Sequence, residues 1–177
     1  VFQRVKKLLD SKAIGDVISY KNSMTGGVIL KKNTGWRNDY SKGGGCLFDY
    51  GPHCFDLSTY FFGTNVNVES SVLKKVFSTD VDDVVNVTLI HNNSIIGHNY
   101  INWSDNSVRK ATNNIEIFGS KGKISANKQE LSVFLNKENC DLKLNEGWNQ
   151  SYVTDENTNV TYYLRGEDFT RQLVEFS

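Results

Sequence analysis

The sequence has no excess of charge, only three cysteines and no long apolar run. Lys plus Arg and Asp plus Glu number 20 each, so the formal net charge is zero. A chain without surplus positive charge has few counterions to release from a nucleic-acid backbone, so we expect no nucleic acid as its main partner. No apolar run approaches the roughly 20 residues that cross a bilayer, and residues 1–9 lack the features of a signal peptide. We therefore expect a cytoplasmic protein without membrane association.

The cysteines argue against both a disulfide framework and a metal site. Cys46, Cys54 and Cys140 are an odd number without paired spacing, which predicts reduced thiols. Cys46, Asp49, His53 and Cys54 are residue types that bind metals, but their spacing fits no ordinary zinc pattern. Adjacent His53 and Cys54 would also point to different faces of a helix. We predict no metal in this chain.

The length of 177 residues suits one domain over 1–177. At that size folding buries roughly 70% of the unfolded surface. The composition, 38% hydrophobic and 12% aromatic, differs clearly from that of a disordered chain. Residues 166–177 have helical spacing and stop without a cap signal, so we expect a domain truncated at both ends.

The first third of the chain alternates helical and extended patterns. Apolar residues over 1–9 are spaced as on one face of a helix, and Gly15 is expected to cap it in the left-handed conformation. Residues 17–20 favour a strand. Residues 21–46 are rich in Gly, Asn, Lys and Ser, which predicts a long ordered loop. The apolar residues that follow fit a helix that begins near Pro52, because proline is disfavoured in a helix interior.

After Gly63, which closes that helix, the pattern changes to strands. Asn92-Asn93 and residues 119–122 are expected to be tight turns. The expected strands cover residues 72–77, 84–90, 95–103, 114–118, 123–127, 130–135 and 160–164. Strands in a run, with helices early and at the end, predict an α+β fold with a largely antiparallel sheet.

The residues that indicate chemistry are Asp49 and His53. Four residues apart on a helical turn, their side chains would share one face and reach a common substrate. A histidine can take a hydroxyl proton at neutral pH, and a carboxylate beside it would orient the ring. Glycines 43–45 would let the backbone approach a ligand closely. On the residues alone, a structural hydrogen bond between Asp49 and His53 is the alternative.

Longer motifs resemble one family. Trp36-Arg37, the three glycines 43–45, and Asp49-x-Gly51-x-His53-x-x-Asp56 match, residue for residue, the C-terminal domain pattern of the Gfo/Idh/MocA oxidoreductases, named for glucose–fructose oxidoreductase and inositol dehydrogenase. Further matches follow in order at residues 13–17, 115–122 and 164–169. The resemblance covers nearly the whole chain.

The resemblance implies an open, mostly antiparallel sheet with helices on one face, as in dihydrodipicolinate reductase, and a second face that packs in homo-oligomers. It implies that His53 is the general base or acid on a substrate hydroxyl and that Asp49 is its carboxylate partner. Trp36, Arg37 and Arg165 would bind the substrate. Hydride would pass directly between a carbon of a sugar, cyclitol or nucleotide-sugar and nicotinamide.

The family's cofactor site is not found in this sequence. Neither a Gly-x-Gly-x-x-Gly after a strand nor the family's Glu-Lys-Pro motif occurs, and glycines 43–45 have the wrong spacing for a dinucleotide fingerprint. NAD or NADP would therefore be bound mainly by an N-terminal Rossmann domain that is absent here. We expect this chain alone to be inactive.

Two other functions compete with the enzyme reading. The chain is alternatively a non-catalytic sugar-binding or dimerisation module of the same fold. A free-standing metal-dependent enzyme is the third reading, and it predicts stoichiometric zinc. The retained pair Asp49 and His53 favours the oxidoreductase, because a scaffold needs no titratable pair there.

Overall fold

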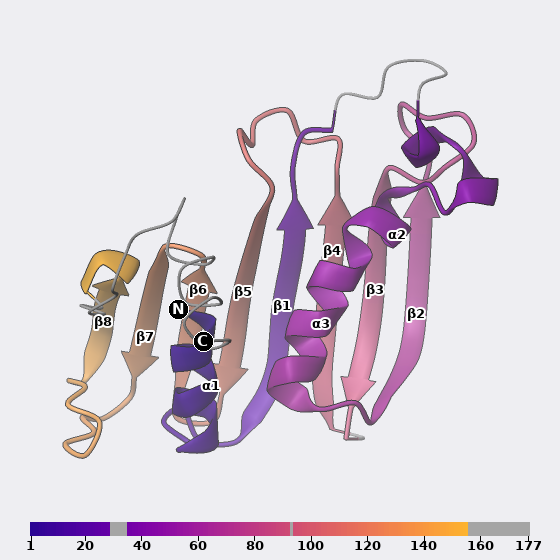
Figure 1. Ribbon diagram of the computed structural model, residues 1–177. Helices are drawn as coiled ribbons and strands as arrows, with labels where there is room; N and C mark the ends of the chain where they lie inside the picture. Colours follow the sequence, from indigo (N-terminus) through magenta and orange to yellow (C-terminus); the bar gives the residue numbers. More distant parts are fainter. Residues whose placement is uncertain (29–34, 93, 156–177) are drawn as a thin grey trace, which may run out of the picture.

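The computed structural model describes residues 1–28, 35–92 and 94–155, which form one open sheet with helices on one face (Figure 1). The sheet has eight strands in the order β2-β3-β4-β1-β5-β6-β7-β8, and every neighbouring pair is antiparallel except β1 and β4. This confirms the predicted α+β fold with a mostly antiparallel sheet. No helix within these ranges has the length and apolar character needed to span a membrane.

The elements follow one another as helix, strand, a helical segment and then a run of strands. The α-helices are α1 (Phe2–Asp10), α2 (Cys46–Asp49) and α3 (Gly51–Phe62), and the short 3-10 helices are η1 (Trp36–Asn38), η2 (Tyr40–Lys42) and η3 (Val153–Asp155). The strands are β1 (Val17–Thr25), β2 (Val66–Lys74), β3 (Val84–His91), β4 (Ile95–Asn102), β5 (Thr112–Gly119), β6 (Gly122–Asn127), β7 (Glu130–Leu135) and β8 (Gly147–Tyr152).

Strict alternation of buried and exposed residues places the core. In β5, β6 and β7 every second residue is buried, among them Ile115, Ile124 and Leu131, because successive side chains point to opposite faces of a sheet. These side chains pack against Val5 and Leu8 of α1 in one cluster. The helices therefore cover the apolar face and leave the other face open.

The helical segment after the glycines consists of two consecutive helices. α2 ends at Asp49, Tyr50 lies between the helices, and α3 starts at Gly51. Pro52 lies in the first turn of α3, where its missing N–H removes no helical hydrogen bond. The expected start near Pro52 is therefore confirmed, and Gly63 follows the last residue of α3 as expected.

Other expectations differ from the structure. α1 ends at Asp10 with Ser11 as its C-cap, so Gly15, which does have a positive φ of 75°, belongs to the turn before β1. β1 continues to Thr25, because Asn22 and Met24 extend the buried alternation that began at Tyr20. The expected loop over 21–46 is correspondingly shorter.

At the far end of the chain the sequence pattern was less informative. The strand expected at 72–77 overlaps only the end of β2, which begins earlier, at Val66, and ends at Lys74. β8 was not predicted, because its residues are polar or glycine apart from two aromatics. The expected strand 160–164 and the expected final helix lie outside the described residues.

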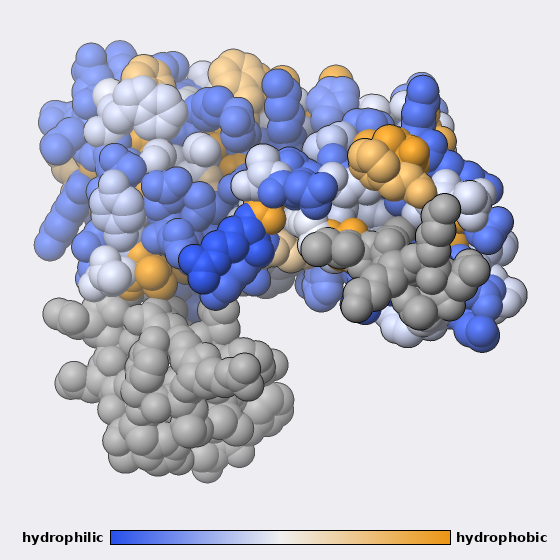
Figure 2. All heavy atoms as spheres, turned by 90° about the horizontal axis from the view of Figure 1, so that it is seen from above, coloured by the Kyte–Doolittle hydropathy of each residue, from blue (hydrophilic) through white to orange (hydrophobic). Residues whose placement is uncertain are grey.

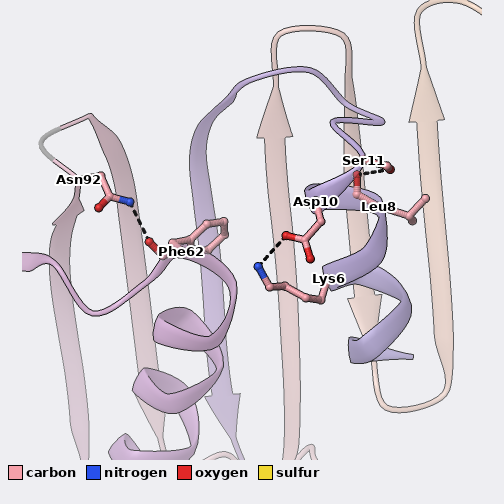
Figure 3. A network of polar contacts seen from close by, with 6 residues as sticks. All are labelled: Lys6, Leu8, Asp10, Ser11, Phe62 and Asn92. Atoms are coloured by element: carbon pink, nitrogen blue, oxygen red, sulfur yellow. Dashed lines mark hydrogen bonds and ion pairs between the residues drawn. The ribbon is translucent and has the colours of Figure 1, made fainter.

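Polar contacts attach α3 to the β3–β4 hairpin. The Asn92 amide donates to the carbonyl of Phe62 at 2.9 Å (Figure 3). His91 is fully buried, with Nδ1 3.1 Å from the carbonyl of Gly63 and Nε2 2.8 Å from the hydroxyl of Tyr20. Burial lowers the pKa of His91, so the ring is held neutral. The end of α3 is therefore fixed by directional bonds.

Candidate functional site

Three of the predicted site residues meet beside α2. Arg37 Nε donates to Asp49 Oδ2 at 2.8 Å, and Arg37 Nη2 donates to Asp49 Oδ1 at 3.4 Å. The guanidinium carbon lies 4.9 Å from the ring centroid of Trp36, a cation–π distance. The hydrogen bond to Asp49 raises the pKa of Arg37. The loop before the glycines is thus joined to the end of α2.

The expected pairing of Asp49 with His53 is absent. In the described part of the chain no hydrogen bond or ion pair joins the two side chains, and the Asp49 carboxylate is bound by Arg37 instead. The physical reason is the helix break at Tyr50, which places Asp49 and His53 on two different helices. His53 is exposed, and its carbonyl accepts from the Asn113 amide at 3.3 Å. Arg165 lies outside the described residues.

The glycine segment 43–45 is packed against the chain itself. A Cβ on Gly44 would lie 2.6 Å from the carbonyl oxygen of Trp36 and 2.5 Å from that of Arg37. Gly45 has a φ of 115°, and a Cβ there would lie 2.5 Å from Asp82 Oδ1. The expected close approach of backbone to a ligand is therefore an approach of backbone to backbone and to a carboxylate. The amides of Gly44 and Gly45 donate to the carbonyls of Asp39 and Arg37 at 2.9 and 3.1 Å, so these amides are not free to bind the pyrophosphate of NAD(P).

Asp82 fixes the start of α2, and the sequence patterns did not indicate this role. Its Oδ2 accepts from the Leu47 amide at 2.7 Å, and its carbonyl accepts from the Cys46 amide at 2.9 Å. These amides are the otherwise unpaired first donors of α2, whose own N-cap, Gly45, has no side chain. Asp82 therefore acts as a cap supplied from a distant part of the chain, and it positions the helix that ends at Asp49.

Asp83, next in sequence, organises the loop between β2 and β3. Its Oδ2 accepts from the amides of Val76, Phe77 and Ser78 at 2.7, 2.7 and 2.8 Å. Its Oδ1 accepts from the Ser78 hydroxyl at 2.7 Å and from Trp103 Nε1 at 2.8 Å. Burial alone would raise the pKa of Asp83, but these hydrogen bonds outweigh it and lower the pKa to about 2.

A buried polar cluster joins α3 to the sheet. The Asn22 amide donates to the Cys54 carbonyl at 2.7 Å and to the Ser58 hydroxyl at 3.0 Å, and Ser58 donates to Asn99 Oδ1 at 3.0 Å. Burial raises the pKa of the Cys54 thiol to about 12, so it stays protonated and is a poor nucleophile or metal ligand. Among the described residues, no group of three His, Cys, Asp or Glu side chains is placed to hold a metal ion.

Comparison with known proteins identifies a family model and a curated relative that match this chain. A family model described as the GFO/IDH/MocA C-terminal domain matches residues 2–125. A curated relative, oxidoreductase P35 of Formosa agariphila, is 35% identical over 80 residues, which is 42% of this chain and 25% of that protein.

Solved structures share the fold. An oxidoreductase domain protein from Kribbella flavida matches with 22% identity and a TM-score of 0.77, over 99% of this chain and 52% of that one. A levoglucosan dehydrogenase in complex with NADH and levoglucosan has 23% identity and a TM-score of 0.71, over 84% and 42%. A 3-ketoreductase from Actinomadura kijaniata, in complex with TDP-benzene and NADP, has 21% identity and a TM-score of 0.63, over 85% and 43%.

The chain spans about half the length of these structures and a quarter of the curated relative. The structural matches are below 25% identity and show the fold, whereas the family model covers well over half of the chain. This chain belongs to the GFO/IDH/MocA family and corresponds to its C-terminal domain.

Proposed function

We propose that this chain is the substrate-binding part of an NAD(P)-dependent oxidoreductase that acts on a CH–OH group of a sugar, cyclitol or nucleotide-sugar. The observation that carries the proposal is the cluster of Trp36, Arg37 and Asp49 at the entry to the helix that presents His53. Relatives named for levoglucosan oxidation and 3-keto reduction support this class of substrate.

The proposed roles follow from exposure and contacts. His53, exposed in the first turn of α3, takes the proton of the substrate hydroxyl, a contribution of roughly 10²–10⁴-fold to the rate. Asp49 holds Arg37, and Arg37 in turn lies over Trp36, so the substrate meets a fixed donor and a fixed aromatic ring. Arg165 is proposed to bind the substrate as well.

The cofactor belongs to another domain in this proposal. Nicotinamide supplies the hydride acceptor or donor when it is bound, and the residues described here position the substrate and move its proton. The poor fit of glycines 43–45 to a phosphate group supports a separate cofactor domain.

We also propose that the open face of the sheet forms a homo-oligomer contact. Ile96, Phe118 and Trp148 are exposed on that face although they are large and apolar. The strand register places them in one row across the sheet: Ile96 opposite Ser19, Ser19 opposite Phe118, Phe118 opposite Lys123, Lys123 opposite Phe134, and Phe134 opposite Trp148. Ser19 and Lys123 lie between the apolar members of this row, but large apolar side chains exposed on an uncovered sheet face are typical of a surface that is covered by a partner.

The test is His53→Ala in the full-length natural protein. We expect NAD(P)-dependent oxidation of its sugar substrate to fall by roughly 10²–10⁴-fold, because no other described side chain is proposed to take the proton. His98→Ala is the matched control, since His98 is exposed on the opposite face of the sheet and should leave the rate unchanged at a protein concentration where size-exclusion chromatography shows the same oligomeric state as the wild type. Unchanged turnover in His53→Ala would refute the catalytic role, and sugar binding without any turnover would favour the non-catalytic module.

A further inference from the structure

A cleft of about 740 Å³ lies next to the candidate site, between the loop 35–42 and the loop 77–80. Three aromatic side chains line it, and all three are exposed: Trp36 at 43%, Tyr40 at 68% and Phe77 at 76%. Viewed from above, a small group of hydrophobic residues (orange) lies among hydrophilic ones at the right-hand end of the molecule (Figure 2). The volume is within the range of small-molecule pockets.

The first wall of the cleft is held by its own hydrogen bonds. Asp39 Oδ1 accepts from the amide and the hydroxyl of Ser41 at 3.0 and 2.6 Å, and Asp39 Oδ2 pairs with Lys42 at 2.8 Å. The Asp39 carbonyl accepts from the Gly44 amide at 2.9 Å. Tyr40 is therefore presented by a fixed turn.

The second wall is held from beneath by Asp83, which binds the amides of Phe77 and Ser78. The neighbouring Asp82 binds the Leu47 amide in the first turn of α2. α2 follows the loop 35–42, which forms the opposite wall. Asp83 thus anchors one wall of the cleft directly, and Asp82 fixes the helix that follows the other wall. Aromatic rings on fixed loops lose little conformational freedom on binding, so this exposure is suited to a ligand.

The polar lining indicates which ligand fits. Besides Asp39, Ser41 and Lys42, the cleft is lined by Ser78, Thr79 and Asp80, which together offer donors and acceptors of hydrogen bonds. Among the lining side chains two carboxylates stand against one ammonium group, which disfavours a phosphate or any other dianion. Lys75 Nζ donates to the Thr79 carbonyl at 3.2 Å, but Lys75 does not line the cleft. A neutral ring with several hydroxyl groups satisfies both features, because its C–H face packs on an aromatic ring and its hydroxyls meet the polar rim.

We infer that this cleft binds a neutral sugar unit of a glycoside or oligosaccharide whose reacting ring lies at the candidate site, with Trp36 shared between the two. The inference rests on the proposed function and narrows its substrate class. Nucleotide-sugars are the class it disfavours, because their diphosphate would face Asp39 and Asp80. Tyr40 and Phe77 are the specificity-determining residues.

The experiment measures binding by calorimetry to the full-length natural protein. The probes are maltotriose, cellotriose and laminaritriose, with UDP-glucose as the anionic comparison. At least one trisaccharide should bind, and Tyr40→Ala and Phe77→Ala should each weaken it roughly tenfold, as truncation of a contact aromatic does. Val76→Ala is the matched control: Val76 is also exposed and its amide is also bound by Asp83, but it does not line the cleft.

Three outcomes would overturn the inference: no trisaccharide binds, both cleft variants bind as the wild type does, or UDP-glucose is the tighter ligand and depends on Phe77. NAD(P)-dependent oxidation of glucose and other monosaccharides, measured on the same variants, separates the two proposals. Monosaccharide oxidation without trisaccharide binding would end the cleft assignment and keep the oxidoreductase. Trisaccharide binding that depends on Phe77, without oxidation of any sugar, would end the oxidoreductase assignment and leave only the binding site.

Discussion

The two halves of the sheet are packed in different ways on the same face. Under α1, strands β5 to β7 contribute aliphatic side chains such as Ile117, Ile124 and Val133. Under α2 and the first turns of α3, buried apolar residues alternate with buried polar ones. The buried polar side chains of the described residues are Asn22, Ser58, Asp82, Asp83, His91, Asn99 and Asn113, and none of them comes from β6 or β7.

The apolar half of the sheet mainly stabilises the fold, and the polar half also positions the candidate site. Apolar burial is non-directional and stabilises the fold without specifying orientation. Hydrogen bonds are directional, and buried polar groups that are satisfied fix one arrangement at the risk of a large cost if a partner is lost. The half that carries Asp49 and His53 is the half held by Asp82 and Asp83. Changes in the apolar half should therefore affect unfolding, and changes in the polar half should also affect the site.

The largest effect on stability is expected from Ile124→Ala in the apolar half. Ile124 of β6 is fully buried in the cluster that includes α1. Truncation of such a side chain costs about 2–5 kcal/mol through lost burial and a residual cavity. Urea unfolding measures the loss. Ile124→Val, which removes one methyl group, is the control and should cost about 1 kcal/mol. The kinetics of the full-length protein, assayed below the unfolding transition, should not change. Altered kinetics would contradict the assignment of this half to stability alone.

The second largest loss of stability, about 2–3 kcal/mol, is expected from Asp83→Ala, because this substitution leaves three backbone amides and the Trp103 indole without their acceptor. The effect should depend on pH. Since the pKa of Asp83 is lowered to about 2, its ionised form stabilises the fold above about pH 4, and this stabilisation is lost as the pH falls from about 4 towards 2. Unfolding measured across that range should show a shallower slope in Asp83→Asn, and an identical slope would contradict the assignment.

Asp82→Ala should cost less, about 1 kcal/mol, as the loss of a helix N-cap does. Its effect on the site should be larger than this suggests, because Asp82 positions the helix that ends at Asp49. We expect kcat/KM of the full-length protein to fall by more than the change in stability explains. Asp82→Asn keeps an acceptor oxygen for the Leu47 amide and should restore most of the activity. Equal activity of wild type and Asp82→Ala would show that α2 needs no such cap.

The smallest effect is expected from His91. Burial lowers its pKa, so the unfolded chain takes up a proton before the folded protein does, and stability should decline as the pH falls below about 6.5. Thermal unfolding between pH 7.5 and 5 measures the decline. His91→Gln retains hydrogen-bonding groups without titrating, so it should flatten the dependence. A decline of the same size in that variant would assign it to other groups.

Much of the fold was predictable where one face of a strand is buried. β3, β4, β5, β6 and β7 lie within one or two residues of the expected strands, because alternation with a period of two is a local signal. The start of α3 at Gly51, next to Pro52, was predictable for an equally local reason. β8 was not, because an edge strand with polar residues carries little alternation.

The candidate site was less accessible to sequence reasoning. Trp36, Arg37 and Asp49 were expected at the site from the family pattern, and the structure brings them together. Their pairing was not expected, because Asp49 bonds a residue twelve positions earlier in place of the neighbour four positions later. Asp82 and Asp83 form a visible carboxylate pair before a hydrophobic strand, but no local feature of the sequence indicates which groups they bind.

By itself, the sequence determined the family, the α+β class, the positions of most strands and the absence of a dinucleotide fingerprint, since each depends on neighbouring residues or on a contiguous motif. Only the tertiary structure decided that glycines 43–45 make room for the chain's own carbonyls, that Asp82 caps α2 from 35 residues away, and that Asp49 belongs to Arg37. The physical reason is that a hydrogen bond depends on where two groups lie in space, and the order of residues along the chain specifies this only after the sheet has formed.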